Sequence, residues 1–165
     1  MNTYKIIMFF IILTIFKGES HNNDTNTNIP NKNNEKSPSK CAKEQIEVSI
    51  QETETKCKEF VKNEIQRRLD DPTLIEEDVK CLTKCVVSYQ VGIVSLSKAV
   101  TEVSAGLFPQ AIGDVTAFTV SVAPCMACCV KLASNDPVLI DFQRWALKNA
   151  LEANQKLESC IIINP

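Results

Sequence analysis

From residue 41 onward, apolar side chains recur every three or four positions, which is the spacing of one face of a helix. The clearest run lies between residues 72 and 104 and consists of Ile75, Val79, Leu82, Val86, Tyr89, Ile93, Leu96, Val100 and Val103. Alternation of apolar and polar residues, typical of a half-buried strand, is not sustained in any segment. The pattern predicts an all-α domain.

Helix-breaking and capping residues divide this region into four expected helices, at about 41–69, 72–104, 109–132 and 137–162. Asp71-Pro72 and Asp136-Pro137 each place a capping residue before a proline, which favours a helix start. Ala105-Gly106 ends the second helix, and Pro124 is expected to bend the third or end its regular part. The short connections favour antiparallel neighbours and predict an up-down-up-down four-helix bundle cross-linked by disulfides.

The first 40 residues differ in character from this domain. Lys5 precedes an apolar run from Ile6 to Phe16, and small residues follow it, so residues 1–20 are predicted to be a signal peptide. Residues 21–40 are rich in Asn, Lys, Ser and Thr and are predicted to be a disordered leader, in which Asn23 opens a glycosylation sequon. Residues 41–165 form the expected domain of a secreted protein without a membrane span.

Four cysteines lie symmetrically about Ala105 and predict a helical hairpin. Cys81 and Cys85 precede it, and Cys125 and Cys129 follow at matching distances. Each pair is one turn apart in its own helix, so the four side chains are expected to meet as two facing pairs.

The expected levels of the helices extend this pairing to the whole set of eight cysteines. The consistent set is Cys85 with Cys125, Cys81 with Cys129, Cys57 with Cys128, and Cys41 with Cys160. Eight cysteines allow roughly a hundred pairings, so the sequence leaves the connectivity open.

The stretch from Cys85 to Cys125 resembles the plant pectin methylesterase inhibitor and invertase inhibitor family. The matching residues keep the family's spacing without a gap: Cys85, Tyr89, Ser95-Leu96, Ala99-Val100, Val103, Ala105-Gly106, Phe108, Ala111, Asp114-Val115, Ala117 and Cys125. The C-terminal segment from Asp136-Pro137 to Leu157 resembles the family's last helix.

The resemblance implies a helical bundle with a disulfide between Cys85 and Cys125, and inhibition of pectin methylesterase more than of invertase. The family's N-terminal hairpin is shortened in this chain. One arrangement makes Cys41 and Cys57 that hairpin's disulfide. The other, which the absence of a helix breaker favours, makes the segment from Cys41 to Leu69 a bundle helix.

Catalytic chemistry is not expected from these residues. The only histidine, His21, falls in the predicted leader, and with all eight cysteines oxidised no Cys–His pair and no metal-ligand set remain. No cofactor is predicted. The net charge of -2 argues against nucleic acid or an anionic membrane as partner.

Charge is scarce between Val86 and Val130, where only Lys98, Glu102 and Asp114 are charged. Interface cores are depleted in charge, so the second and third helices are predicted to present a docking face. Its expected residues are Val87, Val91, Val94, Ser95, Lys98, Ile112, Thr116 and Val120. Closer enclosure of these helices by their neighbours explains the same pattern.

Two functions remain open. The first is a non-catalytic inhibitor of a cell wall enzyme, in the apoplast if the source is a plant. The alternative is a helical carrier of small apolar ligands that resembles insect odorant-binding proteins, suggested by the spacing of Cys81, Cys85 and Cys125.

Overall fold

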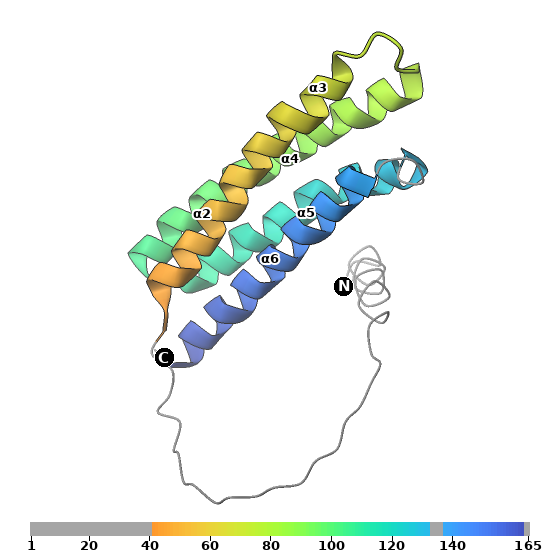
Figure 1. Ribbon diagram of the computed structural model, residues 1–165. Helices are drawn as coiled ribbons and strands as arrows, with labels where there is room; N and C mark the ends of the chain where they lie inside the picture. The colour runs from red at the N-terminus through yellow and green to blue at the C-terminus, as the bar shows by residue number, and fades with distance from the viewer. Residues whose placement is uncertain (1–40, 133–136, 164–165) are drawn as a thin grey trace, which may run out of the picture. The chain divides into compact units, whose positions relative to one another are not determined.

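The computed structural model describes residues 41–132 and 137–163. The predicted signal peptide, the leader with His21, and the sequon at Asn23 lie outside this range. The described chain is helical and contains no strand, which confirms the all-α prediction. Its elements are α2 (Lys43–Phe60), the π-helical turn η2 (Val61–Ile65), α3 (Gln66–Leu69), α4 (Glu76–Ala105), α5 (Phe108–Leu132) and α6 (Pro137–Ile163) (Figure 1).

Four long helical segments surround a common core, because α2, η2 and α3 follow one another without interruption (Figure 1). Helix α2 packs against α4 and α6, and α5 packs against the same two helices. Among the described residues, α2 and α5 do not contact each other, so they lie diagonally across the core.

The π-helical turn explains how the first segment keeps its apolar side chains in the core. Phe60 and Ile65 are both buried, although residues five apart lie on different faces of a regular α-helix. The wider turn of η2 brings them back to one face. The Phe60 ring then stacks on Phe142 of α6, with 3.8 Å between ring centroids.

Helix α4 begins at Glu76, so the predicted start at Pro72 is wrong. The Asp71 carboxylate accepts hydrogen bonds from the backbone N–H and the hydroxyl of Thr73, at 2.9 and 2.7 Å. These bonds form a local turn that competes with helix initiation. Ile75 has an extended backbone and precedes the first turn, in which carboxylates favour the positive end of the helix dipole.

The hairpin between α4 and α5 closes at Gly106, as predicted. Gly106 has a φ of 77°, the left-handed conformation that glycine adopts without strain. The Leu107 N–H donates to the Glu102 carbonyl at 2.8 Å, which closes the end of α4. Helix α5 begins at Phe108 and continues through Pro124 to Leu132, so the regular helix does not end at this proline.

Close approach of α4 and α5 depends on Gly92. A Cβ atom at this position would lie 2.8 Å from Cδ2 of Phe118, closer than real Cβ contacts. The missing side chain therefore makes room for the Phe118 ring, which is fully buried.

Three disulfides cross-link the bundle, and two of the four predicted pairs are confirmed. Cys41 bonds Cys160 and Cys85 bonds Cys125, with Cα atoms 5.0 and 4.4 Å apart. The alternative bond between Cys41 and Cys57 is therefore wrong.

The other two predicted pairs are wrong. Cys81 bonds Cys128 in place of Cys129, and Cys57 and Cys129 are buried free thiols. Cys57 lies on α2, diagonally opposite α5, where the Cα atoms of Cys57 and Cys128 cannot approach to the distance that a disulfide needs.

Candidate functional site

The predicted docking face is exposed on α4. Val87, Val91 and Val94 follow one another at steps of four and three residues, and their exposed fractions are 55%, 54% and 56%. Lys98 continues the same stripe and is exposed. On α5, Val120 is 61% exposed. Exposed apolar side chains that lie together often mark a surface that binds a partner.

The remaining predicted docking residues are placed differently. Ser95 is half-buried, and Ile112 is half-buried and packs against the core. Thr116 is exposed, but its hydroxyl accepts a hydrogen bond from the side chain of Asn154 on α6 at 3.2 Å. These three side chains therefore offer less free surface than the valines. We call the exposed residues Val87, Val91, Val94, Lys98 and Val120 the α4–α5 face.

One acidic pair lies beside the end of this face. Partial desolvation of the Glu102 carboxyl, followed by its charge repulsion and hydrogen bond with Asp114, raises the pKa of Glu102. Glu102 lies one turn beyond Lys98 on α4. As pH falls, Glu102 at this end of the face therefore loses its negative charge at a higher pH than an isolated glutamate does.

The outer surface of α2 is built in the opposite way. Ion pairs join Lys56 to Glu52 at 2.6 Å and Lys58 to Glu54 at 2.7 Å along the helix. Val48 of α2 is 60% exposed but stands in this charged surrounding. The outer surface of α2 thus carries a single exposed valine among charged residues, whereas α4 carries three exposed valines along one stripe.

A second candidate site is the sulfur cluster, formed by the five cysteines Cys81, Cys85, Cys125, Cys128 and Cys129. The free thiol of Cys129 lies in its centre, with its Sγ atom 3.5 Å from that of Cys81 and 3.4 Å from that of Cys85. The Sγ atom of Cys125 is 4.0 Å away. The symmetric spacing about Ala105 predicted that these helices meet here, but not that a thiol would stay free between two disulfides.

Polar and charged groups from several helices surround the free thiol. Burial raises the pKa of Cys129, while Gln143 of α6 and the guanidinium of Arg68 of α3 act in the opposite direction. The Gln143 side chain is buried, and its Nε2 donates to Cys125 Sγ at 2.9 Å. Burial, followed by the nearby thiols of Cys57 and Cys129, raises the pKa of the Tyr89 phenol on α4 well above its usual range.

The sulfur cluster has the spacing of a metal site but not its chemistry in this structure. The Sγ atoms of Cys81, Cys85, Cys128 and Cys129 all lie within 4.8 Å of one another. Zinc requires thiolates, and three of these four sulfurs are bonded in disulfides. The oxidised cluster therefore offers one thiolate ligand, and a ligand set arises only after reduction.

A hollow with a volume of about 360 Å³ lies on α2. It is lined by Glu44, Gln45, Val48, Ser49 and Glu52, is open to solvent, and is walled by this one helix. A carrier of small apolar ligands uses an enclosed cavity lined mainly by apolar side chains, and this hollow is not of that kind.

By length and composition, α4 and the Phe108–Cys129 part of α5 are each apolar enough to cross a membrane. Core helices of soluble proteins share these properties, and 44% and 28% of the two apolar windows are buried inside the domain. The absence of a membrane span therefore stays a prediction.

Comparison with known proteins provides no information about these two candidate sites. No protein-family model, no curated protein and no solved structure matches the chain.

Proposed function

We propose that this chain is a secreted, non-catalytic protein that binds a partner protein through the α4–α5 face. The four helices of the bundle would alternate in direction, so that α4 and α5 form one rigid hairpin. A rigid surface loses little conformational entropy on binding, which favours affinity.

The observation that carries the proposal is the exposed stripe of Val87, Val91 and Val94. Apolar side chains of this size are normally buried, and their exposure costs about 1 kcal/mol or more each relative to burial. A partner that covers the stripe recovers this free energy. The scarcity of charge around it lowers the desolvation cost of the contact.

The partner class follows from the resemblance of residues 85–125 to inhibitors of cell wall enzymes. Pectin methylesterase is the first partner to test, and acid invertase is the second. Cys85–Cys125, the disulfide that the resemblance implies, is present in the structure. The carrier alternative gains no comparable support: the disulfide between Cys57 and Cys85 that would favour it is replaced by the Cys85–Cys125 bond, and Cys57 is a free thiol.

The test is a titration of the secreted protein against purified pectin methylesterase and acid invertase, with residual enzyme activity and binding both measured. Acid and neutral pH are compared, because the raised pKa of Glu102 makes the charge at the end of the face pH-dependent. We expect saturable inhibition of pectin methylesterase. Absence of binding to both enzymes at micromolar concentration would reject this partner class.

A matched pair of variants tests the surface itself. Val91→Asp places a charge in the α4–α5 face and is expected to weaken binding by about tenfold or more. Val48→Asp makes the same change at an equally exposed valine on α2 and is expected to leave binding unchanged. Equal effects of the two substitutions would contradict the assignment of the face. Association with lipid vesicles that Val91→Asp abolishes would point to a membrane in place of a protein partner.

A further inference from the structure

The free thiol of Cys129 lies in contact with sulfurs of two disulfides at once. Its Sγ atom is 3.5 Å from Cys81 Sγ, which is bonded to Cys128, and 3.4 Å from Cys85 Sγ, which is bonded to Cys125. Attack of a thiolate on a disulfide sulfur is the elementary step of thiol–disulfide exchange. The atoms that would react are therefore already neighbours.

We propose that Cys129 exchanges with the Cys81–Cys128 disulfide and moves the free thiol to Cys128, which becomes a latent site for covalent modification by thiol-reactive electrophiles. In this step Cys129 loses its proton, which in the net reaction passes to the departing sulfur, and its thiolate forms a bond to Cys81 Sγ. The Cys81–Cys128 bond breaks, and Cys128 Sγ leaves with the electron pair and takes up a proton. One disulfide and one thiol are present before and after, so no oxidant or reductant is consumed.

Exposure distinguishes this exchange from the one at Cys85. Attack on Cys85 would release Cys125, which is fully buried. Attack on Cys81 releases Cys128, which is half-buried. Only the second product places a thiol where solvent reaches it.

The surroundings of Cys128 suit a released thiol. Its Sγ atom lies 3.3 Å from the carbonyl oxygen of Cys125 and 3.5 Å from that of Cys81. While the disulfide is intact these are contacts without a hydrogen. Once Cys128 is protonated, its S–H can donate to either oxygen. After the exchange, the new thiol on Cys128 therefore has hydrogen-bond acceptors within reach.

Cys57 provides an internal reference. It is the other buried thiol, and burial together with the nearby Glu54 raises its pKa to about 12. Among the described residues, it makes no contact with a disulfide sulfur like those of Cys129. Burial alone therefore does not confer the exchange that we assign to Cys129.

The test is alkylation of the folded, oxidised full chain with N-ethylmaleimide, followed by non-reducing peptide mapping. We expect the label on Cys128, a new Cys81–Cys129 bond, and intact Cys85–Cys125 and Cys41–Cys160 bonds. Cys125, Cys128 and Cys129 share one tryptic peptide, so fragment ions that divide Cys128 from Cys129 assign the label. A label on Cys129 with Cys81–Cys128 intact, a label on Cys125, or no label on Cys128 would overturn the proposal.

Two variants separate exchange from simple exposure. Cys129→Ala removes the attacking sulfur and is expected to lower the labelling rate of Cys128 by about tenfold or more, whereas Cys57→Ala leaves it unchanged. Labelling of Cys128 that persists in Cys129→Ala would overturn the mechanism.

A third variant tests the proposal even if Cys129→Ala does not fold. In Cys128→Ala, Cys81 loses its partner, and we expect a Cys81–Cys129 bond in the folded protein. Circular dichroism verifies that the helices are retained. A folded Cys128→Ala protein with free thiols on both Cys81 and Cys129 would contradict the proposal.

Discussion

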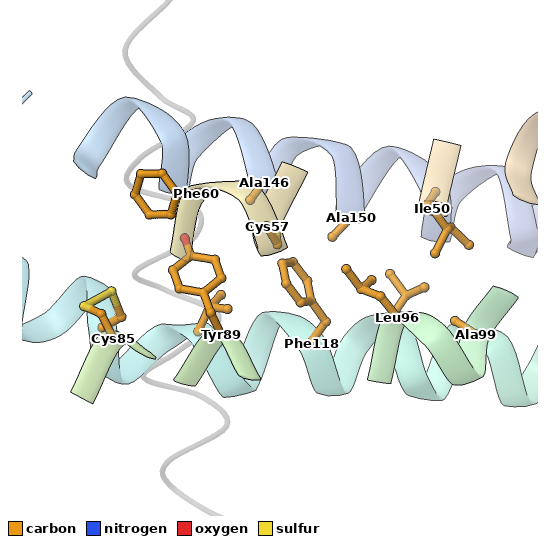
Figure 2. Close-up of a cluster of buried hydrophobic side chains, with 14 of the residues drawn as sticks. Ile50, Cys57, Phe60, Cys85, Tyr89, Leu96, Ala99, Phe118, Ala146 and Ala150 are labelled. Atoms are coloured by element: carbon orange, nitrogen blue, oxygen red, sulfur yellow. A yellow bond between two sulfur atoms is a disulfide. The ribbon is translucent and has the colours of Figure 1, made fainter. Parts of the chain in front are cut away.

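The two ends of the bundle core are filled with different kinds of side chain. At one end Ile50, Leu96 and Ala99 meet as plain aliphatic groups, and at the other Phe60 and Tyr89 lie beside the Cys85 disulfide (Figure 2). The aliphatic end is closed by the Cys41–Cys160 disulfide. The sulfur-rich end holds the sulfur cluster.

The two ends are expected to contribute differently, one to the stability of the fold and the other to chemical reactivity. The aliphatic end is a set of interchangeable contacts, whose free energy depends on the apolar area that they bury. The sulfur-rich end combines a free thiol at Cys129, a buried amide at Gln143 and the π-helical turn η2 on the neighbouring segment. Irregular turns of this type concentrate at functional sites. We therefore expect substitutions at the aliphatic end to change stability, and those at the sulfur-rich end to change reactivity.

The largest expected effect is the loss of the disulfide that closes the aliphatic end. Cys41 and Cys160 are 119 residues apart, and the chain-entropy model gives about 5 kcal/mol for a loop of this size. Cys41→Ala/Cys160→Ala should lower the free energy of unfolding by this order, measured by urea denaturation without reductant.

The control is Cys128→Ala at the other end, where Cys129 can replace the lost partner of Cys81. It is expected to cost well under half as much. An equal loss in both variants would erase the distinction between the two ends.

Leu96→Ala tests the aliphatic packing. Leu96 is fully buried, and a leucine truncated in a core costs about 2–5 kcal/mol because a cavity remains. Val94→Ala, two residues away on the exposed side of α4, should change stability by less than about 0.5 kcal/mol. Thermal and urea unfolding measure both. A small effect of Leu96→Ala would mean that this end collapses around the cavity.

Alkaline pH tests the buried thiol of Cys57, which lies between the two ends (Figure 2). Its pKa in the folded protein is raised to about 12 from an ordinary value of 9.0. Between these values the unfolded chain loses the proton and the folded chain keeps it, so stability falls as pH rises. The contribution is at most about 1.4 kcal/mol per pH unit.

Cys57→Ala should make the loss of stability above pH 9.0 shallower. Urea unfolding at a series of pH values gives the slope directly. An unchanged slope in Cys57→Ala would show that other groups dominate the alkaline loss.

Tyr89→Phe has the smallest expected effect. The Tyr89 hydroxyl is buried and has no hydrogen-bond partner among the described residues. Its removal relieves a desolvation cost, so stability should stay within about 1 kcal/mol of the parent or rise. A loss of several kcal/mol in urea unfolding would indicate that the hydroxyl is hydrogen-bonded in solution.

The periodic apolar pattern was sufficient to predict the helices, because each long helix presents one buried stripe. It also placed Cys85 with Cys125 and Cys41 with Cys160, since both pairs lie level across neighbouring helices. The capping signature failed at Asp71-Pro72, where the same residues serve a turn as readily as a helix start. The bulge at η2 depends on which side chains the core must accept and has no local signal.

The choice between Cys128 and Cys129 was beyond reach from the sequence. Adjacent residues on a helix point about 100° apart, so the partner of Cys81 depends on the rotation of α5 against α4. The same limit applies to the docking face. The exposed valines of α4 were predicted correctly as surface residues, whereas the half-burial of Ser95 and Ile112 depends on where neighbouring helices lie.

The Cys41–Cys160 disulfide has a mechanical consequence. It joins the chain just before α2 to the end of α6, with Cα atoms 5.0 Å apart. A force applied to the chain before Cys41 and after Cys160 passes through this covalent bond, and the helices between them carry no tension. In a pulling experiment the oxidised domain should extend by almost nothing, and reduction should release the full contour of the bundle.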